Sequence, residues 1–384
     1  MTDSRLGPVR IVATAVAVVT LVACGSPGSD RASGEGLESP LPRSEVYRVE
    51  RVADDIYATV VQDGISPSRF AASLIVIRDD HVVVVDSRHD DESAQELIDT
   101  IAALTALPVG YVVNTHWHGD HVQGNARFRE VFPEVRFVAG ATVAEDLMSL
   151  GRQRLDEEVA RVDARAEAAG GWLAAGAGPD GTALTAEEIE ALPGQIAAAR
   201  AYADERRSLE LVPPTIVVEN RFELVEGDPT IEIIRVGPAH TRGDVVVYLP
   251  DHGVLALGDL IEDGFPWFGD GFPRGWADAM DRIVDIPGTV LLGAHGPVLR
   301  DREALETQRR FTRRIAETAA AAVTAGVGLE QAMSGGEFEE FQTRYTIRMT
   351  DATEAERTER FAAFVREVLT RAVAEAAGDL EETR

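Results

Sequence analysis

Three of the chain's eight histidines and one aspartate fall within six consecutive positions of the segment NTHWHGDHVQGN. They are His116, His118, Asp120 and His121. Random placement of eight histidines would produce the H-x-H-x-x-H spacing only about 0.003 times in a chain of this length. Imidazole and carboxylate groups bind transition metals and transfer protons. The segment is therefore the first candidate for a functional site.

The spacing within this segment favours two metal ions. Residues two positions apart in an extended chain point the same way, so His116 and His118 can bind one ion together. Asp120 and His121 are adjacent and diverge, which suits a second ion, and Gly119 allows a tight turn between the pairs. We expect two divalent ions, Zn²⁺ first, with Fe or Mn as alternatives because ligand type rarely fixes the metal.

Further metal-binding residue types follow apolar runs along the chain. Five runs end in such a residue: HVVVV in Asp86, GYVVNT in His116, IEIIRVGPA in His240, VLALG in Asp259 and TVLLGA in His295. One histidine at the end of a strand is more often structural than a ligand. Several such ends that meet the dense cluster favour a common site, because open α/β sheets keep their sites outside the strand ends.

The elements around these residues predict an α/β layered architecture. Residues 82–85 read as a buried strand, DESAQELIDTIAALTAL has helical spacing, and GYVVN is the next strand. Between about 141 and 213 the composition shifts to Ala, Glu and Arg, with a capping box at Thr185–Glu188, so we expect two or three inserted helices. From about residue 301 the chain is again helical, with a second capping box at Thr353–Glu356.

The motifs THWHGDHVQGN, AHTRGD, LGDL and GAHGPV, in this order and spacing, resemble the metallo-β-lactamase-fold hydrolases with their H-x-H-x-D-H signature. The resemblance covers roughly residues 47–300. It implies a four-layer αββα sandwich of two mixed β-sheets with helices outside, plus a helical insertion. On this basis we expect the fold domain at residues 45–300, the insertion at about 141–213, and a C-terminal helical extension at 301–384 packed on the same domain.

The resemblance also implies ligands for two metal ions. By position in the motifs they are, for the first ion, His116, His118 and His240; for the second, Asp120, His121 and His295; and, as the bridge, Asp259. Asp120 would also orient a metal-bridging hydroxide and carry its proton, which makes it the candidate catalytic residue. Asp86 and Thr241 are expected to brace the ligands by hydrogen bonding.

Asp259 discriminates between activities within this family. β-Lactamases of this fold tend to have cysteine or serine at the bridging position, whereas thioesterase-like, lactonase-like and nuclease-like relatives have aspartate. Two departures from the family pattern, QG at 123–124 and Ala239 before His240, remove no ligand. We predict a dinuclear hydrolase of a small ester, thioester, lactone or amide. The alternatives are a metallo-β-lactamase acting on β-lactam antibiotics and a non-catalytic surface metal-binding protein.

The loop after Asp259 is rich in aromatic residues. IEDGFPWFGDGFPRGW contains Phe265, Trp267, Phe268 and Phe272. These side chains either line an apolar substrate pocket or pack the loop onto the sandwich, and both interpretations stay open.

The charge of the chain limits its partners. The formal net charge is −28, which disfavours nucleic acid, so we expect a small-molecule substrate. Every basic residue is an arginine. Arg242 and Arg274 lie near the ligand motifs and are candidates to hold a substrate carboxylate. The sequence makes no prediction about self-association.

The N-terminus predicts export. Arg5 and Arg10 precede the 14-residue apolar run IVATAVAVVTLVAC, which is too short to span a bilayer comfortably. LVAC resembles a bacterial lipobox, and Cys24 is the only cysteine. We expect a lipoprotein signal peptide at 1–23, lipidation of Cys24, a flexible tether at 24–44 and an extracytoplasmic protein anchored to the bacterial cell membrane. An ordinary cleaved signal with a chance cysteine is the alternative.

Overall fold

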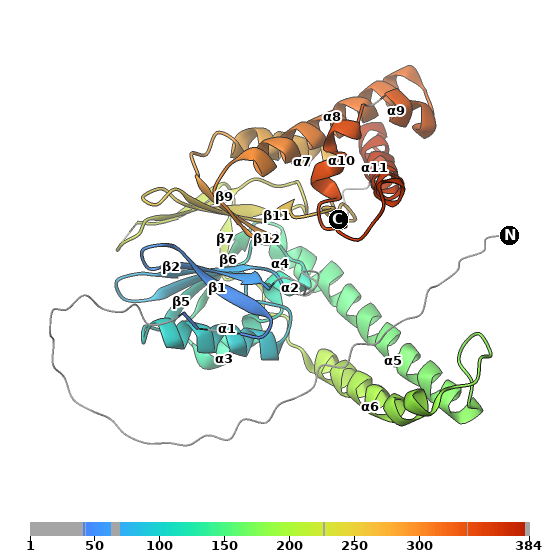
Figure 1. The fold of residues 1–384 in the computed structure, drawn as a ribbon. Coiled ribbons are helices and arrows are strands. Elements are labelled where there is room, and N and C mark those ends of the chain that lie inside the picture. Colours follow the sequence, from blue (N-terminus) through green and yellow to red (C-terminus); the bar gives the residue numbers. More distant parts are fainter. Residues whose placement is uncertain (1–40, 43, 63–69, 226, 336, 381–384) are drawn as a thin grey trace, which may run out of the picture. The chain divides into compact units, whose positions relative to one another are not determined.

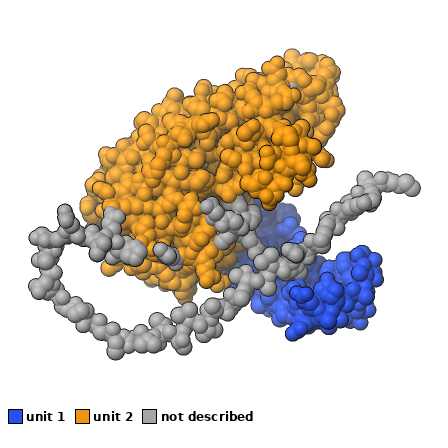
Figure 2. All heavy atoms as spheres, in the orientation of Figure 1, with its two compact units in different colours: residues 1–40, 153–209 blue, residues 41–152, 210–384 orange. Residues whose placement is uncertain are grey.

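The computed structural model describes residues 41–42, 44–62, 70–225, 227–335 and 337–380. The predicted signal peptide, Cys24 and most of the tether lie outside these residues. No helix within the described ranges is long and apolar enough to cross a membrane. The described chain forms two compact units, one of residues 153–209 and the other of the described residues within 41–152 and 210–380 (Figure 2).

The larger unit contains two mixed β-sheets (Figure 1). The strands of the first sheet follow chain order: β1 (Tyr47–Ala53), β2 (Ile56–Val61), β3 (Ser73–Ile77), β4 (Val82–Val85), β5 (Val109–Val113), β6 (Arg136–Gly140) and β7 (Ile216–Val218). Neighbours from β1 to β4 are antiparallel, and those from β4 to β7 are parallel.

The second sheet has the order β13-β12-β11-β10-β9-β8. Its strands are β8 (Arg221–Leu224), β9 (Ile231–Arg235), β10 (Val245–Leu249), β11 (Val254–Glu262), β12 (Val290–His295) and β13 (Val298–Leu299). β11 and β12 are parallel, and the other neighbours are antiparallel. β4 and β10 are buried on both faces, which explains their unbroken apolar sequences.

Helices cover the outer faces of both sheets. Those against the first sheet are α1 (Asp91–Leu104) and α3 (Asn125–Val131), and those against the second are α7 (Pro273–Ile283), α8 (Glu303–Ala325) and α11 (Glu354–Ala377). Shorter helices are α2 (Gly119–Val122), α4 (Val143–Asp146), η2 (Leu147–Gly151), α9 (Leu329–Gly335), η3 (Glu339–Phe341) and α10 (Gln342–Tyr345).

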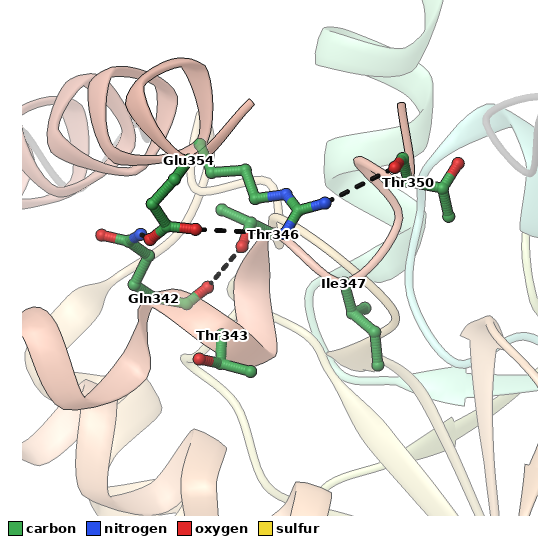
Figure 3. Close-up of a pocket in the computed structure, with 7 residues that line it drawn as sticks. Gln342, Thr343, Thr346, Ile347, Thr350 and Glu354 are labelled. Atoms are coloured by element: carbon green, nitrogen blue, oxygen red, sulfur yellow. Dashed lines mark hydrogen bonds and ion pairs between the residues drawn. The ribbon is translucent and has the colours of Figure 1, made fainter. Parts of the chain in front are cut away.

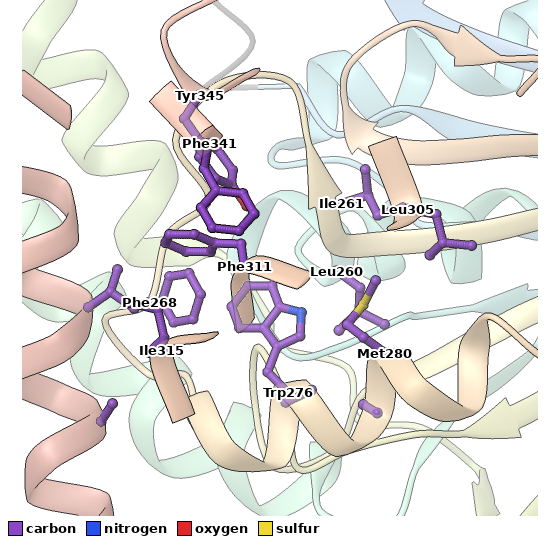
Figure 4. Packing of buried hydrophobic residues seen from close by; sticks show 14 of the residues in the cluster. Leu260, Ile261, Phe268, Trp276, Met280, Leu305, Phe311, Ile315, Phe341 and Tyr345 are labelled. Carbon is purple, nitrogen blue, oxygen red and sulfur yellow. The ribbon is translucent and has the colours of Figure 1, made fainter. Parts of the chain in front are cut away.

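Three apolar clusters separate the layers. One fills the space between the sheets with side chains such as Val83, Val113 and Val247. A second joins β3–β6 to α1 and α3. A third joins β9–β12 to the C-terminal helices, and its aromatic part includes Phe311 and Trp276 (Figure 4). The predicted αββα sandwich of two mixed sheets is confirmed.

The smaller unit consists of two long helices that lie within the predicted insertion. α5 (Arg152–Ala175) and α6 (Ala186–Ser208) are linked by a hydrogen bond from the Tyr202 hydroxyl to Glu158 at 2.6 Å. The capping box predicted at Thr185 is present at the start of α6, and the one predicted at Thr353 starts α11. The preceding residues 141–152 belong to the larger unit, as do the C-terminal helices.

Candidate metal centre

The seven predicted ligands lie together in the larger unit. His116 and His118 follow β5, Asp120 and His121 are in α2, and His240 follows β9. Asp259 lies near the end of β11, and His295 is the last residue of the parallel neighbour β12. Their donor atoms form two groups, each with donor atoms within 4.8 Å of one another: His116, His118, His240 and Asp259; and Asp120, His121 and His295.

Three imidazole nitrogens of the first group converge. His118 Nδ1 lies 3.0 Å from Nε2 of His116 and 2.9 Å from Nε2 of His240. The other nitrogen of His118, Nε2, lies 2.8 Å from an Asp270 carboxylate oxygen, so it carries the proton. The lone pair of His118 Nδ1 therefore points at the nitrogens of the two other rings. A cation shared by three such nitrogens satisfies them together, as in three-histidine metal sites.

The second group leaves buried polar atoms unsatisfied. Nε2 of His295 and of His121 lie 3.3 and 3.6 Å from the same Asp120 oxygen. Within the described part of the chain, His121 Nε2 and Asp259 Oδ1 are buried without a hydrogen-bond partner, although they lie 3.2 Å apart. Unsatisfied buried donors and acceptors are costly, and a metal ion between these atoms would satisfy both. The donor set thus fits a metal centre.

Asp259 faces both groups. Its Oδ2 lies 3.6 Å from His116 Nε2 and 3.4 Å from His240 Nε2. Its Oδ1 lies 3.2 Å from His121 Nε2 and 3.4 Å from His295 Nε2. One oxygen of Asp259 is thus directed at His116 and His240, and the other at His121 and His295.

The electrostatics of the two groups differ. Burial lowers the pKa of His116 well below its usual value and that of His240 to about 3, so both rings are neutral at pH 7. Burial also lowers the pKa of His121 and His295, but nearby carboxylates, Asp259 foremost, outweigh it and raise both pKa values well above the usual value. His116 and His240 can therefore accept a cation directly, whereas a cation bound by His121 and His295 would displace protons.

A buried carboxylate orients the second group. Asp86 Oδ2 lies 2.8 Å from His121 Nδ1, and Asp86 Oδ1 accepts a hydrogen bond from the Thr115 backbone N–H at 2.8 Å. The Thr115 hydroxyl also donates to Asp86, at 2.9 Å. Gly258 has a positive φ of 55°, and a Cβ there would lie 2.7 Å from Thr115 Oγ1. The glycine before Asp259 therefore leaves room for the threonine that holds Asp86.

A second carboxylate orders the loop of His240. Asp244 accepts hydrogen bonds from the backbone N–H and hydroxyl of Thr241, both at 2.9 Å, and from the Ala239 N–H at 3.2 Å. Burial raises the pKa of Asp244 to about 7, although the Thr241 bonds lower it. Thr241 was predicted to brace a ligand. Its hydrogen bonds, together with that of Ala239, tie the backbone on both sides of His240 to Asp244.

The aromatic residues of the loop after Asp259 differ in whether they pack the loop onto the fold or lie open beside the ligands. Phe265 packs on Phe364, with ring centroids 4.9 Å apart, and Phe268 packs on Trp276 at 4.3 Å. Trp267, between them in the sequence, is exposed and lies beside the His118 ring. The two phenylalanines therefore pack the loop onto the fold, whereas the Trp267 ring contacts the rings of His118 and His240 while the residue stays exposed.

Arg242 does not present an open cation to substrate. Its guanidinium forms a salt bridge with the buried Asp146, and hydrogen bonding to Asp146 raises the pKa of Arg242. The sequence-based expectation that Arg242 holds a substrate carboxylate is therefore not supported by its contacts.

Two acidic residues near the ligands were missed from the sequence. Asp270 contacts His118 Nε2, and Glu262 accepts a hydrogen bond from the backbone N–H of Trp267 at 3.2 Å. Burial raises the pKa of Glu262 to about 8, helped by the charge of Asp259. Both lie in the segment that was singled out for its aromatics, and neither has a spacing relative to the histidines that would have identified it.

Comparison with known proteins gives a family match. The family model described as the metallo-β-lactamase superfamily matches residues 68–310. A linear primary-alkylsulfatase from Pseudomonas sp. (strain ATCC 19151) is 22% identical over 244 residues, which are 60% of this chain and 42% of that protein. The chain thus spans less than half the length of this curated relative.

Solved structures of similar fold include a metallo-β-lactamase from Pontibacter korlensis, with 19% identity and a TM-score of 0.47 over 70% of this chain and 99% of that chain. Another is VMB-1, with 16% identity and a TM-score of 0.49 over 71% of this chain and all of that one. FIM-1 from Pseudomonas aeruginosa, in its mono-zinc form, has 17% identity and a TM-score of 0.47 over 72% of this chain and 98% of that chain.

Proposed function

The chain belongs to the metallo-β-lactamase superfamily of metal-dependent hydrolases, and from this premise we propose that it uses two metal ions to hydrolyse a small ester, thioester, lactone or amide. The observation that carries the proposal is the position of Asp259, whose two oxygens face two separate groups of donor atoms. A single ion would need only one of these groups. A carboxylate bridge between two ions is typical of hydrolytic dinuclear sites.

The first ion would be held by His116, His118 and His240, and the second by Asp120, His121 and His295. When bound, two divalent ions polarise the scissile bond and lower the pKa of water towards neutrality. Zn²⁺ is the proposed metal, with Fe or Mn as alternatives, because imidazole and carboxylate ligands suit all three.

Asp120 is the proposed catalytic residue. Its side chain is 19% exposed, against 7% for Asp259, so it is the more accessible of the two carboxylates. Asp120 would orient the attacking water and accept its proton at a carboxylate oxygen. The water oxygen bonds to the acyl carbon, the bond to the alcohol, thiol or amine breaks, and the proton leaves with that group.

A second candidate substrate class is a linear alkyl sulfate. It is supported by the 22% identity with a protein named as a linear primary-alkylsulfatase, over 60% of this chain. β-Lactams rank below both classes, because the bridging residue is Asp259 and not cysteine or serine.

We also propose that the protein is exported and anchored by a lipid on Cys24. The support is the LVAC sequence at the end of an apolar run and the lack of a second cysteine. An extracytoplasmic site would meet substrates that arrive from outside the cell.

The experiment compares kcat/KM for 4-nitrophenyl acetate, an acyl thioester, a lactone, dodecyl sulfate, a penicillin and a phosphodiester, using metal-loaded protein. We expect the fastest turnover among the carboxylic ester, thioester and lactone substrates. Faster turnover of dodecyl sulfate or of the penicillin would instead select that class. Chelated protein and Asp120→Asn are the controls. If no substrate is hydrolysed by protein that binds metal, the non-catalytic metal-binding function replaces this proposal.

A further inference from the structure

We propose that the indole of Trp267 is a substrate-contacting surface that gives this enzyme a preference for esters with an alkyl chain. The inference rests on the proposed function, because it takes the neighbouring histidines as the site of hydrolysis. It goes beyond that function by assigning a substrate class and the residue that selects it.

The indole lies directly beside the first group of ligands. Its ring centroid is 5.1 Å from that of His118 and 6.0 Å from that of His240, in both cases edge to face. As a residue, Trp267 is nevertheless 41% exposed, whereas Phe268, the next residue along the chain, is buried. A large apolar surface left open beside a reactive site is typical of a binding surface.

The loop is built to hold the indole in this place. Phe265 and Phe268, on either side, pack into the cluster under the C-terminal helices. The backbone N–H of Trp267 donates a hydrogen bond to the Glu262 carboxyl group at 3.2 Å. A Cβ on Gly269 would lie only 2.0 Å from the indole, so this glycine is required for the ring to occupy its position.

The same loop also carries Asp270, which holds His118 through a 2.8 Å contact. Trp267 and the carboxylate that orients a ligand are therefore only three positions apart. A substrate chain lying on the indole would place its polar end near the histidines. The large apolar ring of an indole favours contact with an alkyl chain.

Another exposed apolar residue provides a matched control. A hollow of about 380 Å³ is lined by Gln342, Thr346, Ile347, Thr350, Glu354 and Arg357, among others (Figure 3). Ile347 is 55% exposed there, and none of the lining residues belongs to the groups of metal-binding residues. Ile347→Ala thus removes a similarly exposed apolar side chain at a place outside those groups.

The test measures kcat/KM for 4-nitrophenyl esters from acetate to octanoate with the metal-loaded wild type, Trp267→Ala, Trp267→Phe and Ile347→Ala. We expect Trp267→Ala to lower the octanoate-to-acetate ratio of kcat/KM by about tenfold or more, mainly through KM. Trp267→Phe should retain the ratio within about threefold, since it keeps an aromatic ring. Metal content, measured on each variant, should be unchanged.

Two results would overturn the inference. One is an octanoate-to-acetate ratio that is the same in Trp267→Ala as in the wild type. The other is an equal fall of the ratio in Ile347→Ala, because the chain preference would then not reside at Trp267. If the wild type hydrolyses none of the esters, the proposed function has failed, and a binding measurement decides the inference by itself.

That measurement is the change in tryptophan emission when decanoate is added to metal-loaded protein. The wild type should respond, whereas Trp267→Phe should respond much less, because the other three tryptophans remain in both proteins: Trp117 and Trp276 are buried, and Trp172, in α5, is half-buried. Acetate should give no change in either protein. A response to decanoate of equal size in Trp267→Phe would contradict contact with this indole.

Discussion

The Nδ1 atom of His121 donates a hydrogen bond to Oδ2 of Asp86 at 2.8 Å. A proton fixed on Nδ1 leaves Nε2 as the ligand atom, and this atom faces Asp120 and Asp259. Asp86 lies at the end of β4 and is itself held by Thr115 at the end of β5. The neighbouring strands of the first sheet thereby determine which nitrogen of His121 can bind metal.

Asp86→Asn should weaken the second metal site. Asp86 has a positive φ of 64°, which asparagine tolerates better than alanine, so this variant perturbs the backbone least. Asp86 uses two carboxylate oxygens to accept hydrogen bonds from Thr115 and His121, whereas the asparagine amide has only one acceptor oxygen. We expect the affinity for the second metal equivalent to fall about 10- to 100-fold, with the first nearly unchanged. Calorimetric titration with Zn²⁺ checks this, and an equal loss at both sites would contradict it.

Gly258→Ala should disturb Thr115, the residue that holds Asp86 in place. The new Cβ would lie 2.7 Å from the Thr115 hydroxyl oxygen, in addition to the strain of a positive φ. We expect a loss of about 2–3 kcal/mol in the free energy of unfolding and weaker metal binding. Gly326→Ala is the matched control, because Gly326 also has a positive φ, of 63°, but open space around it.

The control variant should lose only about 1 kcal/mol in denaturant unfolding, with metal affinity unchanged. Equal losses in the two glycine variants would show that backbone strain alone, and not the contact with Thr115, explains the result.

Arg344→Met, a change in the C-terminal extension, should weaken metal binding at His295. Arg344, in α10, donates to the Asp263 carboxylate at 2.9 Å and to the Glu262 carbonyl at 2.8 Å. The Asp263 N–H in turn donates to the His295 carbonyl at 3.1 Å. We expect about tenfold weaker binding of the second metal equivalent, measured by calorimetry.

Arg366→Met serves as its control, since Arg366 pairs with Glu330 on the exposed surface of the same extension. Its metal affinity should equal that of the wild type. An Arg344→Met protein that binds both equivalents as tightly as Arg366→Met would refute the role assigned to Arg344.

Cys24→Ala should release the protein from membranes. In a bacterial host the wild type should sediment with the membrane fraction, and the variant should move to the soluble extracytoplasmic fraction, because a lipid on Cys24 is the proposed anchor. The measurement is immunoblotting of fractions with mass spectrometry of the N-terminus. Wild-type protein that is fully soluble with an intact N-terminus would contradict the anchor.

The layered fold could be predicted because local patterns and motif order agreed. The unbroken valine run at 82–85 predicted a buried strand, and the structure has β4 there, buried on both faces. Capping boxes at Thr185 and Thr353 correctly marked two helix starts. These signals are local in sequence, so a single chain suffices to find them.

The contacts that orient the ligands could not be predicted, because they join distant segments. Asp270 meets His118 across 152 positions, and Arg344 meets Asp263 across 81. Neither pair has a spacing rule, and acidic residues and arginines are common throughout this chain. The same limit applies to Trp267, since its exposure depends on the packing of its neighbours in the folded loop.

If hydrolysis needs two metal ions, activity depends on the second equivalent, and an activity titration tests this most directly. Metal-free protein is given Zn²⁺ in steps from zero to four equivalents, and the initial rate with 4-nitrophenyl acetate is measured at each step. We predict that the rate rises until two equivalents are bound, and that His121→Ala binds one equivalent and loses most of the activity. A maximal rate at one equivalent, or a rate independent of added metal, would contradict the dinuclear account.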